Sequence, residues 1–451
     1  MATLVAGLTN EDLSISDEAT SMAHESHHHD IEPPGKFEVP KGFVTTAIVF
    51  IVLGLAAFLF GLFSDNEARA WRGYVIGFWF TFSLALSGPF FIATQYLSKA
   101  GWSVSIRRIP EAMGTFLIPS VVLGAIALFG ADHLFGWIDL APEVFDPESE
   151  LYDPIVAAKE AVLSETVLIF VTVGATAALA IMYAIMRKFS LQQDEEGGYE
   201  LMHKNIWVSA IFIIVFVISV SVMSWYWTMS YDPHWYSMMW SVYAFAGLFQ
   251  TGLAVMILVL LYMMSKKLFG DCVGTEQVHR MGQLLFGFTV FYAYIHFSQF
   301  LLLWYANIPE TAKWYTDRMS EGWGIYLLLI PIFKFAIPFF ALLRQKAKKN
   351  HKNILVYVCI LLVGMQALEI WMWVMPYIYG VGLMAPMVPT FEILITLGFV
   401  GLFMIVVAKS LARHNLVPLK DPLLHEAVPH SHDHLIYPNG KPGESGQDDD
   451  E

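Results

Sequence analysis

Long apolar runs recur along this chain and are separated by short polar links. A helix that crosses the hydrocarbon core of a bilayer needs about 20 consecutive apolar residues. Runs of that length predict ten transmembrane helices, at roughly 43–63, 73–97, 113–137, 161–187, 205–229, 236–264, 277–305, 322–343, 353–376 and 390–410. Tryptophan and tyrosine gather at the ends of several runs, where amphipathic rings prefer the membrane surface. The pattern predicts an all-α integral membrane protein.

The two ends of the chain are polar and acidic. We expect an acidic tail at 1–41, a ten-helix membrane domain at 42–410, and a second acidic tail at 411–451 that carries histidines. Each tail holds eight acidic residues, against two basic residues in the first tail and three in the second. Because 1–41 has no apolar core of the kind found in signal peptides, we expect no cleaved leader.

Basic residues concentrate in alternate links between the predicted helices. The link at 138–153 holds six acidic residues and no basic one. Lysine and arginine are enriched in cytoplasmic loops, so both termini are predicted to be cytoplasmic and the loop 138–160 to lie outside. The basic links, which follow even-numbered helices, carry Lys99, Arg107, Arg108, Lys188, Lys204, Lys266, Lys267, Arg344, Lys346, Lys348, Lys349 and Lys352.

One basic link leaves two interpretations open. The segment 98–112 contains Arg107 and Arg108 together with Trp102 and several small residues. This pattern fits a short helix at the membrane surface, with its basic residues toward the lipid headgroups, and fits an ordinary basic loop equally well.

Composition supports a membrane location. Hydrophobic residues make up 56% of the 451 residues and charged residues 15%, and the mean hydropathy is +0.54. Soluble domains carry about 25% charged residues, so the excess apolar surface is expected to face lipid. The net charge of −14 resides largely in the tails and one loop, and it argues against nucleic-acid binding.

The sequence offers few ligands for a redox cofactor or a metal. Cys272 and Cys359 are far apart and belong to no haem-attachment or iron–sulfur motif. A haem b would need two histidines facing each other near midplane, whereas His133 and His296 lie near the ends of apolar runs. We therefore expect no cofactor and no metal site in this chain. Composition favours a solvated tail over a metal site for His425, His430, His432 and His434.

Polar residues inside the apolar runs are the candidate functional residues, since burying them in a membrane is costly. Nearly all of them lie between midplane and the predicted outer face, and the inner half of the runs is almost purely apolar apart from Gln95 and serines. Hydration at the interface is an equal alternative for Asp132, His133 and Glu392. Hydrogen bonding between helices is the alternative for Gln299 and Gln366. The proton-path candidates are Asp132, His133, Glu165, His296, Gln299, Lys334, Gln366 and Glu369.

Lys334 is the deepest of these candidates, about 15 Å from either face at 1.5 Å per residue. Its nearest acidic candidate is Glu369, on the next antiparallel helix. A histidine between them, His296, would titrate near neutrality and could pass a proton. These depths favour a half-channel open to the outside, and a static ion pair that fixes the helices is nearly as well supported.

Two loop residues complete the candidate set. Asp232 precedes Pro233, a pair that favours a turn, and His234 follows it. We expect His234 to cap the sixth helix from outside, and a direct ligand role is the less favoured interpretation.

Several motifs in this chain resemble the ActF subunits of bacterial alternative complex III, which are polysulfide-reductase or NrfD-like membrane proteins. The likeness runs from about 70 to 345, and it departs from the family where Tyr226 stands in place of an expected acidic residue. The motifs are Gln95-Tyr96-Leu97, Gly101-Trp102-Ser103, Arg107-Arg108-Ile109-Pro110-Glu111, Trp227-Thr228-Met229-Ser230-Tyr231-Asp232-Pro233-His234-Trp235-Tyr236-Ser237, Val242-Tyr243-Ala244-Phe245-Ala246-Gly247, Phe297-Ser298-Gln299 and Trp304-Tyr305-Ala306-Asn307-Ile308-Pro309-Glu310.

This resemblance implies an architecture and a role. The implied fold has two four-helix bundles, helices two to five and six to nine, flanked by helices one and ten. The implied role is that of a cofactor-free subunit of a quinol:cytochrome c oxidoreductase in the bacterial inner membrane, which supports assembly and proton translocation without redox chemistry of its own. The quinol-binding subunit itself is the alternative within the family.

The resemblance also implies partners. These are a multihaem cytochrome c subunit, an iron–sulfur subunit, a monohaem cytochrome c subunit and a paralogous NrfD-like membrane subunit, with haem c and iron–sulfur clusters held by the partners. Menaquinone or its quinol, lipids and a terminal oxidase are further candidates. A secondary transporter is less favoured, because Pro331 and Pro338 interrupt helix eight while the matching helix four has no proline. A purely structural anchor is also compatible with the sequence.

Overall fold

The computed structural model describes most of the chain between the two tails. Its described residues form helices and no strand. Nearly all of the predicted tail at 1–41 and the end of the tail at 411–451 lie outside the described residues. The described residues are 36–427, except 65–66, 142, 271, 320–321, 346–347, 349–351 and 377–388.

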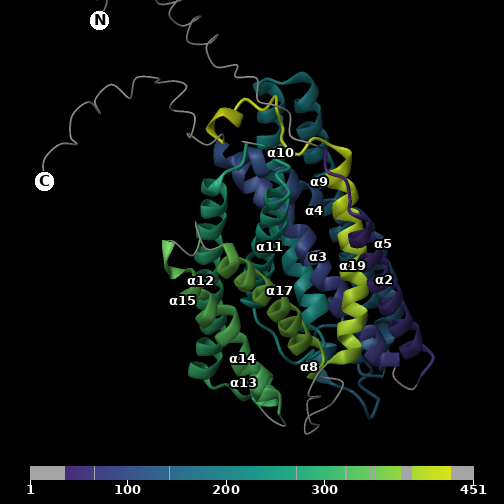
Figure 1. Cartoon of the computed structure of the whole chain (residues 1–451). Coiled ribbons are helices and arrows are strands. Elements are labelled where there is room, and N and C mark those ends of the chain that lie inside the picture. The colour runs from purple at the N-terminus through teal and green to yellow at the C-terminus, as the bar shows by residue number, and fades with distance from the viewer. Residues whose placement is uncertain are drawn as a thin grey trace, which may run out of the picture. The chain divides into compact units, whose positions relative to one another are not determined.

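Within this part of the chain, ten helical spans are long and apolar enough to cross a membrane, as the hydropathy pattern predicts. The chain is therefore a multi-pass membrane protein. Seven spans are single helices: α2 (Lys41–Leu62), α3 (Glu67–Leu97), α9 (Glu165–Glu196), α11 (Trp240–Ser265), α12 (Thr275–Ala306), α17 (Lys352–Val374) and α19 (Thr390–Arg413) (Figure 1).

The other three spans contain irregular turns. The third span joins α4 (Arg108–Gly114), α5 (Leu117–Ala127) and α6 (Ala131–Leu134). In the fifth span, α10 (Tyr199–Ser224) continues into a π-helical turn, η3 (Trp225–Met229). The eighth span has a π-helical turn, η4 (Ile332–Ala336), between α14 (Trp323–Pro331) and α15 (Ile337–Leu343).

Short helices occupy the links. They are η1 (Gly101–Ile106), α7 (Gly136–Asp139), α8 (Pro154–Ala157), α13 (Pro309–Met319) and η5 (Leu424–Glu426). Local sequence explains two of their boundaries. Asp153 accepts hydrogen bonds from the first amides of α8, and Pro154 occupies the first helical position. Asn307 ends α12 in the left-handed conformation, with φ 46°, before Pro309 starts α13.

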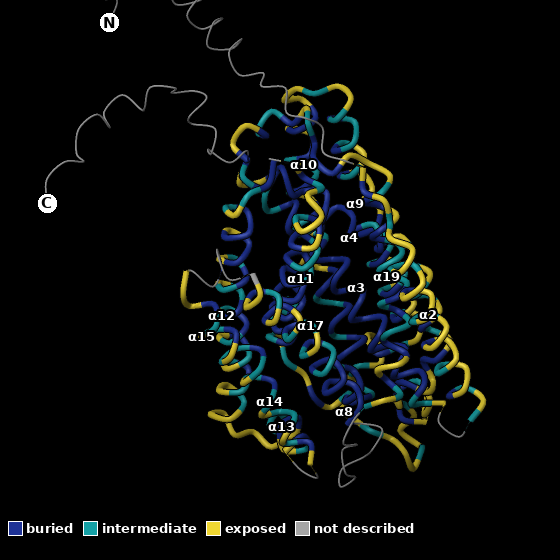
Figure 2. Tube along the Cα trace, viewed as in Figure 1, coloured by how far each residue is buried: buried dark blue, intermediate teal, exposed yellow. Residues whose placement is uncertain are grey.

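The second span, α3, forms the centre of the fold. In its most apolar window 94% of the residues are buried, and it contacts α2, α4, α5, α10, α11, α17 and α19. Figure 2 shows α3 as a dark blue helix surrounded by these neighbours. Hydropathy does not separate such a helix from a lipid-facing one, because both are apolar.

The first and last spans pack tightly against each other through glycines. A Cβ atom on Gly54 of α2 would lie 2.5 Å from the Cα of Gly398 on α19, and one on Gly401 would lie 2.5 Å from the carbonyl oxygen of Ala47. Only small residues allow two helix backbones to approach this closely in a membrane. The contact fixes α2, which has few other neighbours.

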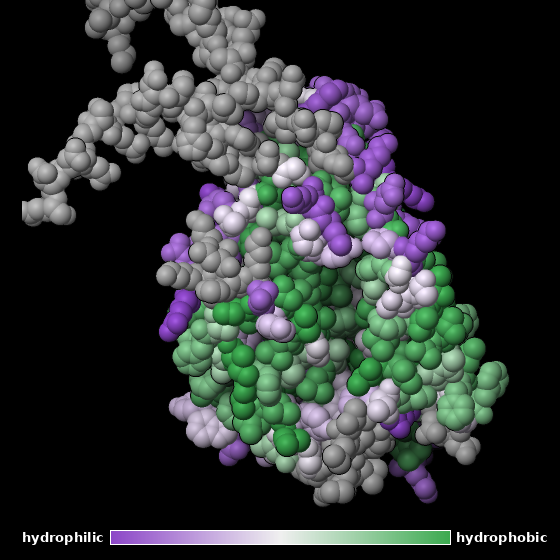
Figure 3. Space-filling model, viewed as in Figure 1, coloured by the Kyte–Doolittle hydropathy of each residue, from purple (hydrophilic) through white to green (hydrophobic). Residues whose placement is uncertain are grey.

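Apolar side chains cover the sides of the helices. Large residues such as Phe60, Phe170 and Trp207 are at least 70% exposed. On the face seen in Figure 3, a hydrophobic band crosses the molecule, with hydrophilic residues toward both ends. A surface of this kind is stable when it faces lipid.

The link at 98–112 is helical, as one of the two predicted alternatives has it, but its arginines do not lie at the membrane surface. Residues of η1 are mostly buried, and Arg107 and Arg108 are only 6% and 3% exposed. The predicted position of these arginines at the lipid headgroups is wrong, because Arg107 pairs with Asp421 and Arg108 with Glu111 inside the protein.

Candidate functional site

The eighth span carries a lysine into the interior of the helices. Lys334 is fully buried and lies on the π-helical turn η4. Pro331 and Pro338 flank this turn, and a proline cannot donate the backbone hydrogen bond of a regular helix. π-helical turns widen a helix locally and occur often at functional sites. The side-chain amide of Gln250 donates to the backbone carbonyl of Lys334 at 3.1 Å and holds the turn in place.

The ammonium group of Lys334 is held by partners on two other spans. Its Nζ donates to Oε2 of Glu369 at 2.5 Å and to Oε1 of Gln366 at 2.6 Å, both on α17. It also lies 4.0 Å from the ring centre of Tyr292 on α12. The structure thus joins Lys334 to the acid that the sequence marks as its nearest candidate.

The carboxylate of Glu369 accepts three hydrogen bonds. Oε2 accepts from Lys334, and Oε1 accepts from the hydroxyl groups of Tyr243 on α11 and Tyr292 on α12. A buried charge is tolerated when it is paired and fully hydrogen-bonded. We call Lys334, Glu369, Gln366, Tyr243, Tyr292 and His296 the Lys334 network.

His296 extends this network toward the protein surface. Its Nδ1 lies 2.9 Å from the hydroxyl oxygen of Tyr243. Because that hydroxyl uses its one proton on Glu369, the histidine must donate from Nδ1. His296 is half-buried, whereas the other members of the network are buried. Within the network it is therefore the residue closest to the surface.

A glycine makes room for the network. A Cβ atom on Gly247 of α11 would lie 2.8 Å from Oε1 of Gln366 and 3.2 Å from Oε2 of Glu369. One turn further along α11, the hydroxyl of Thr251 lies 3.1 Å from the same Gln366 oxygen. The four spans are thereby joined around one buried charge pair.

Tryptophans cover the network at its α13 end. Trp240 lies with its ring centre 5.3 Å from Trp235, 5.5 Å from Trp314 and 5.1 Å from Trp373. All four are at most 4% exposed. This layer separates the network from the end of the helices at α13, and His296 is the member of the network that is only half-buried.

Other sequence candidates lie away from the Lys334 network. Asp132 and His133 are partly exposed on α6, and His133 lies 3.1 Å from Glu67. Glu165 is exposed in the first turn of α9. Gln299 is buried and accepts a 2.9 Å hydrogen bond from Ser237. Among the described residues, these four share no hydrogen bond or ion pair with the network.

Asp232 and His234 belong to a separate loop contact. His234 Nε2 lies 2.6 Å from the Asp153 carboxylate, and its backbone amide donates to Asp232 at 3.1 Å. Burial opposes the charge of Asp153, yet the amide of Val156 and then His234 hold the pKa of this carboxyl below its usual value. The predicted capping of the sixth helix by His234 is wrong, because α11 begins at Trp240 without a side-chain cap.

Glu392 is not hydrated at the interface, contrary to one of the two alternatives. It is 2% exposed and accepts two hydrogen bonds from Arg69, at 2.7 and 3.2 Å. This pair joins the start of α19 to the start of α3 and lies outside the Lys334 network.

A second group of buried ionic residues lies near the turn between α9 and α10, beyond the ends of the predicted apolar runs. Glu111 accepts hydrogen bonds from Arg108, Ser190 and Arg187, the last at 3.2 Å. Arg108 also binds Asp194. These residues lie in the links, outside the predicted apolar runs, except Arg187 at the end of one run. We call Arg108, Glu111, Arg187, Ser190 and Asp194 the α4–α9 cluster.

A neighbouring contact ties down the segment after α19. Arg107 donates to Asp421 at 2.5 Å and to the hydroxyl of Tyr96 at 3.0 Å. Burial alone would lower the pKa of Arg107, but Tyr96, Asp421 and Glu111 raise it above the usual value. The segment 414–427 is thus fixed to the link between the second and third spans.

The Lys334 network has the chemistry of a proton relay. Carboxylate, lysine, phenol and imidazole groups can each gain or lose a proton, and they are joined by direct hydrogen bonds. Among the described residues, no group of three or more histidine, cysteine or acidic residues has metal-binding geometry.

Comparison with models of known protein families and with curated proteins finds no match for this chain. Its class is therefore defined by the fold and the site: a multi-pass helical membrane protein with a buried charge network between four spans.

Proposed function

We propose that this chain is a cofactor-free membrane subunit of a quinol-oxidising respiratory complex of the alternative complex III type, and that the Lys334 network moves protons in it. The observation that carries the proton path is the ion pair between Lys334 and Glu369, buried in mid-span and linked to the half-buried His296 through Tyr243. The resemblance of the sequence motifs to ActF subunits supports the choice of complex.

A proton would reach this site through His296. Protonation of the imidazole at Nε2 would let Nδ1 give its proton to the oxygen of Tyr243 as that hydroxyl passes its own to Glu369. The protonated carboxyl would then release Lys334 from its charge partner. The two proton transfers follow the hydrogen bonds from His296 to Tyr243 and from Tyr243 to Glu369. Beyond Lys334 the polar contacts continue to Gln366, Thr251 and Gln250.

The proposal includes an arrangement and an orientation. Contacts of α9 with α5 and α10, and of α11 with α12 and α17, support two four-helix bundles made by spans two to five and six to nine. The first and tenth spans, α2 and α19, flank them. Basic links support cytoplasmic termini in a bacterial inner membrane, so that the α13 end and His296 face outward and the Lys334 network forms an outward half-channel.

Purification of the tagged full-length chain from its native membrane tests the complex. We expect a multihaem and a monohaem cytochrome c, an iron–sulfur subunit and a related membrane subunit to copurify in fixed ratio, as measured by mass spectrometry and haem absorbance. Copurification of none of these subunits would contradict the respiratory role.

Glu369→Gln tests the proton path, since it keeps the side-chain volume and removes the acid. In liposomes that contain the purified complex, we expect proton release per quinol to fall sharply while the subunits remain assembled. The matched control is Glu392→Gln, which alters a carboxylate that is equally buried but lies outside the network. Full proton release by an assembled Glu369→Gln complex would rule out this residue as a relay.

A further inference from the structure

A groove runs along the last turns of α9, outside the Lys334 network. Its volume is about 440 Å³, within the range of small-molecule sites. Lining residues of α9 recur every three or four positions and so share one face of the helix. The opposite wall is formed by Thr115 and Ile118, at the start of α5. Ile118 is 54% exposed, so the groove faces the surroundings of the membrane domain.

The groove changes in polarity along its length. α9 has 32 residues, which is about 48 Å at 1.5 Å per residue, whereas the hydrocarbon core of a bilayer is about 30 Å thick. The last turns of α9, from Arg187 onward, therefore reach headgroup level. Ile118 and Ala184 lie on the hydrocarbon side of Arg187. The hydrocarbon side of the groove thus has the apolar Ile118 and Ala184 beside the polar Thr115 and Tyr183, and the headgroup side is polar apart from Leu191.

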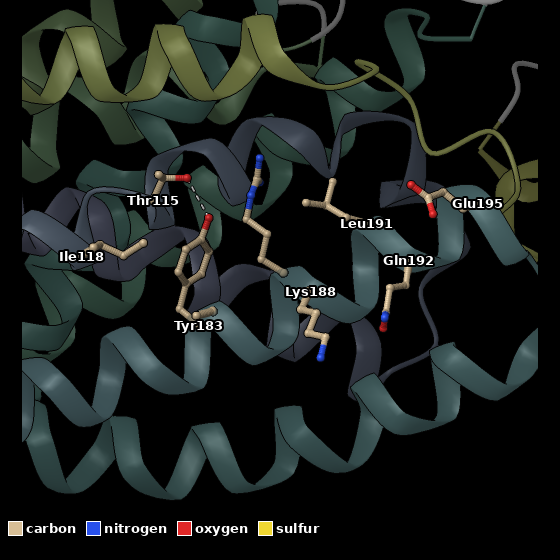
Figure 4. Close-up of a pocket in the computed structure, with 9 residues that line it drawn as sticks. Thr115, Ile118, Tyr183, Lys188, Leu191, Gln192 and Glu195 are labelled. Atoms are coloured by element: carbon tan, nitrogen blue, oxygen red, sulfur yellow. Dashed lines mark hydrogen bonds between the residues drawn. The ribbon is translucent and has the colours of Figure 1, made fainter.

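Two cations stand where the headgroup would lie. Arg187 is held in place by Glu111 at 3.2 Å and by Ser410 at 3.0 Å, which uses two of its five N–H donors. Lys188 is exposed on the rim. In Figure 4, Lys188 and Gln192 point the same way from successive turns of α9, whereas Tyr183 points the opposite way in this view and its hydroxyl meets that of Thr115.

The acidic residue that lines the groove, Glu195, lies away from Arg187 and Lys188 and so does not repel an anion bound beside them. Glu195 lies seven residues beyond Lys188, about 10 Å further along the helix axis. It stands at the distal end of the groove, where it would face the outer part of a headgroup. In the α4–α9 cluster beneath the groove, the charges of two arginines are balanced by those of two carboxylates. The exposed ammonium of Lys188 adds a positive charge to this balanced group.

We propose that this groove binds one glycerophospholipid, with its phosphate at Arg187 and Lys188 and an acyl chain along Ile118 and Ala184. Basic recesses between transmembrane helices are suited to phosphate headgroups. The phosphate would pair with the two cations, and the apolar wall would favour a lipid over a free anion. Binding would connect the α4–α9 cluster to the lipid around it.

Native mass spectrometry of the full-length chain in detergent tests the site. The three probes are phosphatidylglycerol, diacylglycerol with the same chains, and inorganic phosphate. We expect one phosphatidylglycerol to remain bound, diacylglycerol to bind at least several-fold more weakly, and inorganic phosphate alone to leave the chain unliganded. Equal retention of diacylglycerol, or tight binding of phosphate alone, would overturn the proposal.

Two variants locate the lipid. Lys188→Gln should weaken phosphatidylglycerol binding about fivefold, the effect of one surface cation, and Ala184→Trp should abolish it by filling the apolar end. Lys204→Gln is the matched control, because Lys204 is exposed on α10, pairs with Glu200 and does not line the groove. Unchanged binding in Lys188→Gln would overturn the site even if Ala184→Trp fails to fold.

Discussion

The Lys334 network and the α4–α9 cluster are two solutions to the same problem, a buried carboxylate between transmembrane helices. Glu369 and Glu111 each accept three side-chain hydrogen bonds and are at most 1% exposed. Their partners differ. Glu369 has one lysine and two phenols, whereas Glu111 has two arginines and a serine.

The difference in partners distinguishes a site that can transfer protons from a site that only holds helices together. Lysine, tyrosine and histidine can change protonation when their surroundings change, but arginine keeps its charge in proteins. Protonation of Glu369 would leave one mobile cation, while Glu111 stays fixed between two permanent charges. We therefore assign proton transfer to the Lys334 network and a structural role to the α4–α9 cluster.

The largest expected effect comes from removing the single cation of the Lys334 network. Lys334→Met leaves Glu369 buried without a counter-charge and should destabilise the protein by about 3–5 kcal/mol. Arg187→Met should cost less, because Arg108 still pairs with Glu111. Thermal unfolding of both variants in the same detergent measures the difference. Equal losses would remove the distinction between the two sites.

The double variant Lys334→Met with Glu369→Leu sharpens this comparison. Replacing both members of a buried ion pair with apolar groups is often nearly neutral or stabilising. We expect stability to rise above that of Lys334→Met but to stay below that of the unmodified chain, because the hydroxyls of Tyr243 and Tyr292 lose their acceptor; proton release should stay low. If the double variant is no more stable than Lys334→Met alone, the pair is not an isolated electrostatic unit.

Gly247→Ala should have an intermediate effect on the Lys334 network. The added methyl group would lie 2.8 Å from the oxygen of Gln366, and crowding in a filled core costs about 1–3 kcal/mol. Gly174→Ala is the control, since a Cβ at that position meets nothing within 4 Å. Unfolding measurements on the two variants should separate them, and equal stability would argue against the close contact at Gly247.

Two tyrosines allow a matched test of the Lys334 network against the α4–α9 cluster. Tyr243→Phe and Tyr183→Phe each remove a buried hydroxyl, and each should cost about 1–3 kcal/mol. Only Tyr243 joins Glu369 to His296, whereas Tyr183 donates to the backbone carbonyl of Glu111 at 2.5 Å. Proton release by the assembled complex should fall in Tyr243→Phe alone. A similar fall in both variants would contradict the assignment.

The smallest expected effect is a pH response beside the α4–α9 cluster. Partial burial, Arg187, Arg108 and Arg413 lower the pKa of His414 below 6.5, with Glu111 acting in the opposite direction. As pH falls below about 6.5, the unfolded chain therefore takes up this proton first, and stability should decrease. His414→Gln should remove this small component below about pH 6.5. An unchanged pH dependence would exclude His414 as its source.

Hydropathy predicts the ten spans because the membrane requires about 20 apolar residues from each one. It also places Lys334 beside Glu369, since a short link makes their helices antiparallel neighbours. The same pattern does not single out Tyr243 and Tyr292, because an uncharged aromatic side chain also fits the apolar interior of a span. Only their contacts identify them as donors to Glu369.

The sequence does not predict the α4–α9 cluster, and the reason is different. Arg108, Arg187 and Asp194 lie near the ends of spans, where charged residues are expected to be hydrated. Their burial depends on the link at 98–112 folding inward and on the segment after α19 covering it. Arg107 and Asp421, which fix that cover, are 314 residues apart, and no local pattern predicts such a pairing.

The glycine contact between α2 and α19 cannot form until nearly the whole chain has been synthesised. Gly54 is made 344 residues before Gly398, which at about 5–20 residues per second is a delay of roughly 20–70 s. Throughout that interval the first span sits in the membrane without its main neighbour. During that time the glycine surface of α2 is accessible to other membrane proteins and chaperones. The fold is completed only after the last helix has been synthesised.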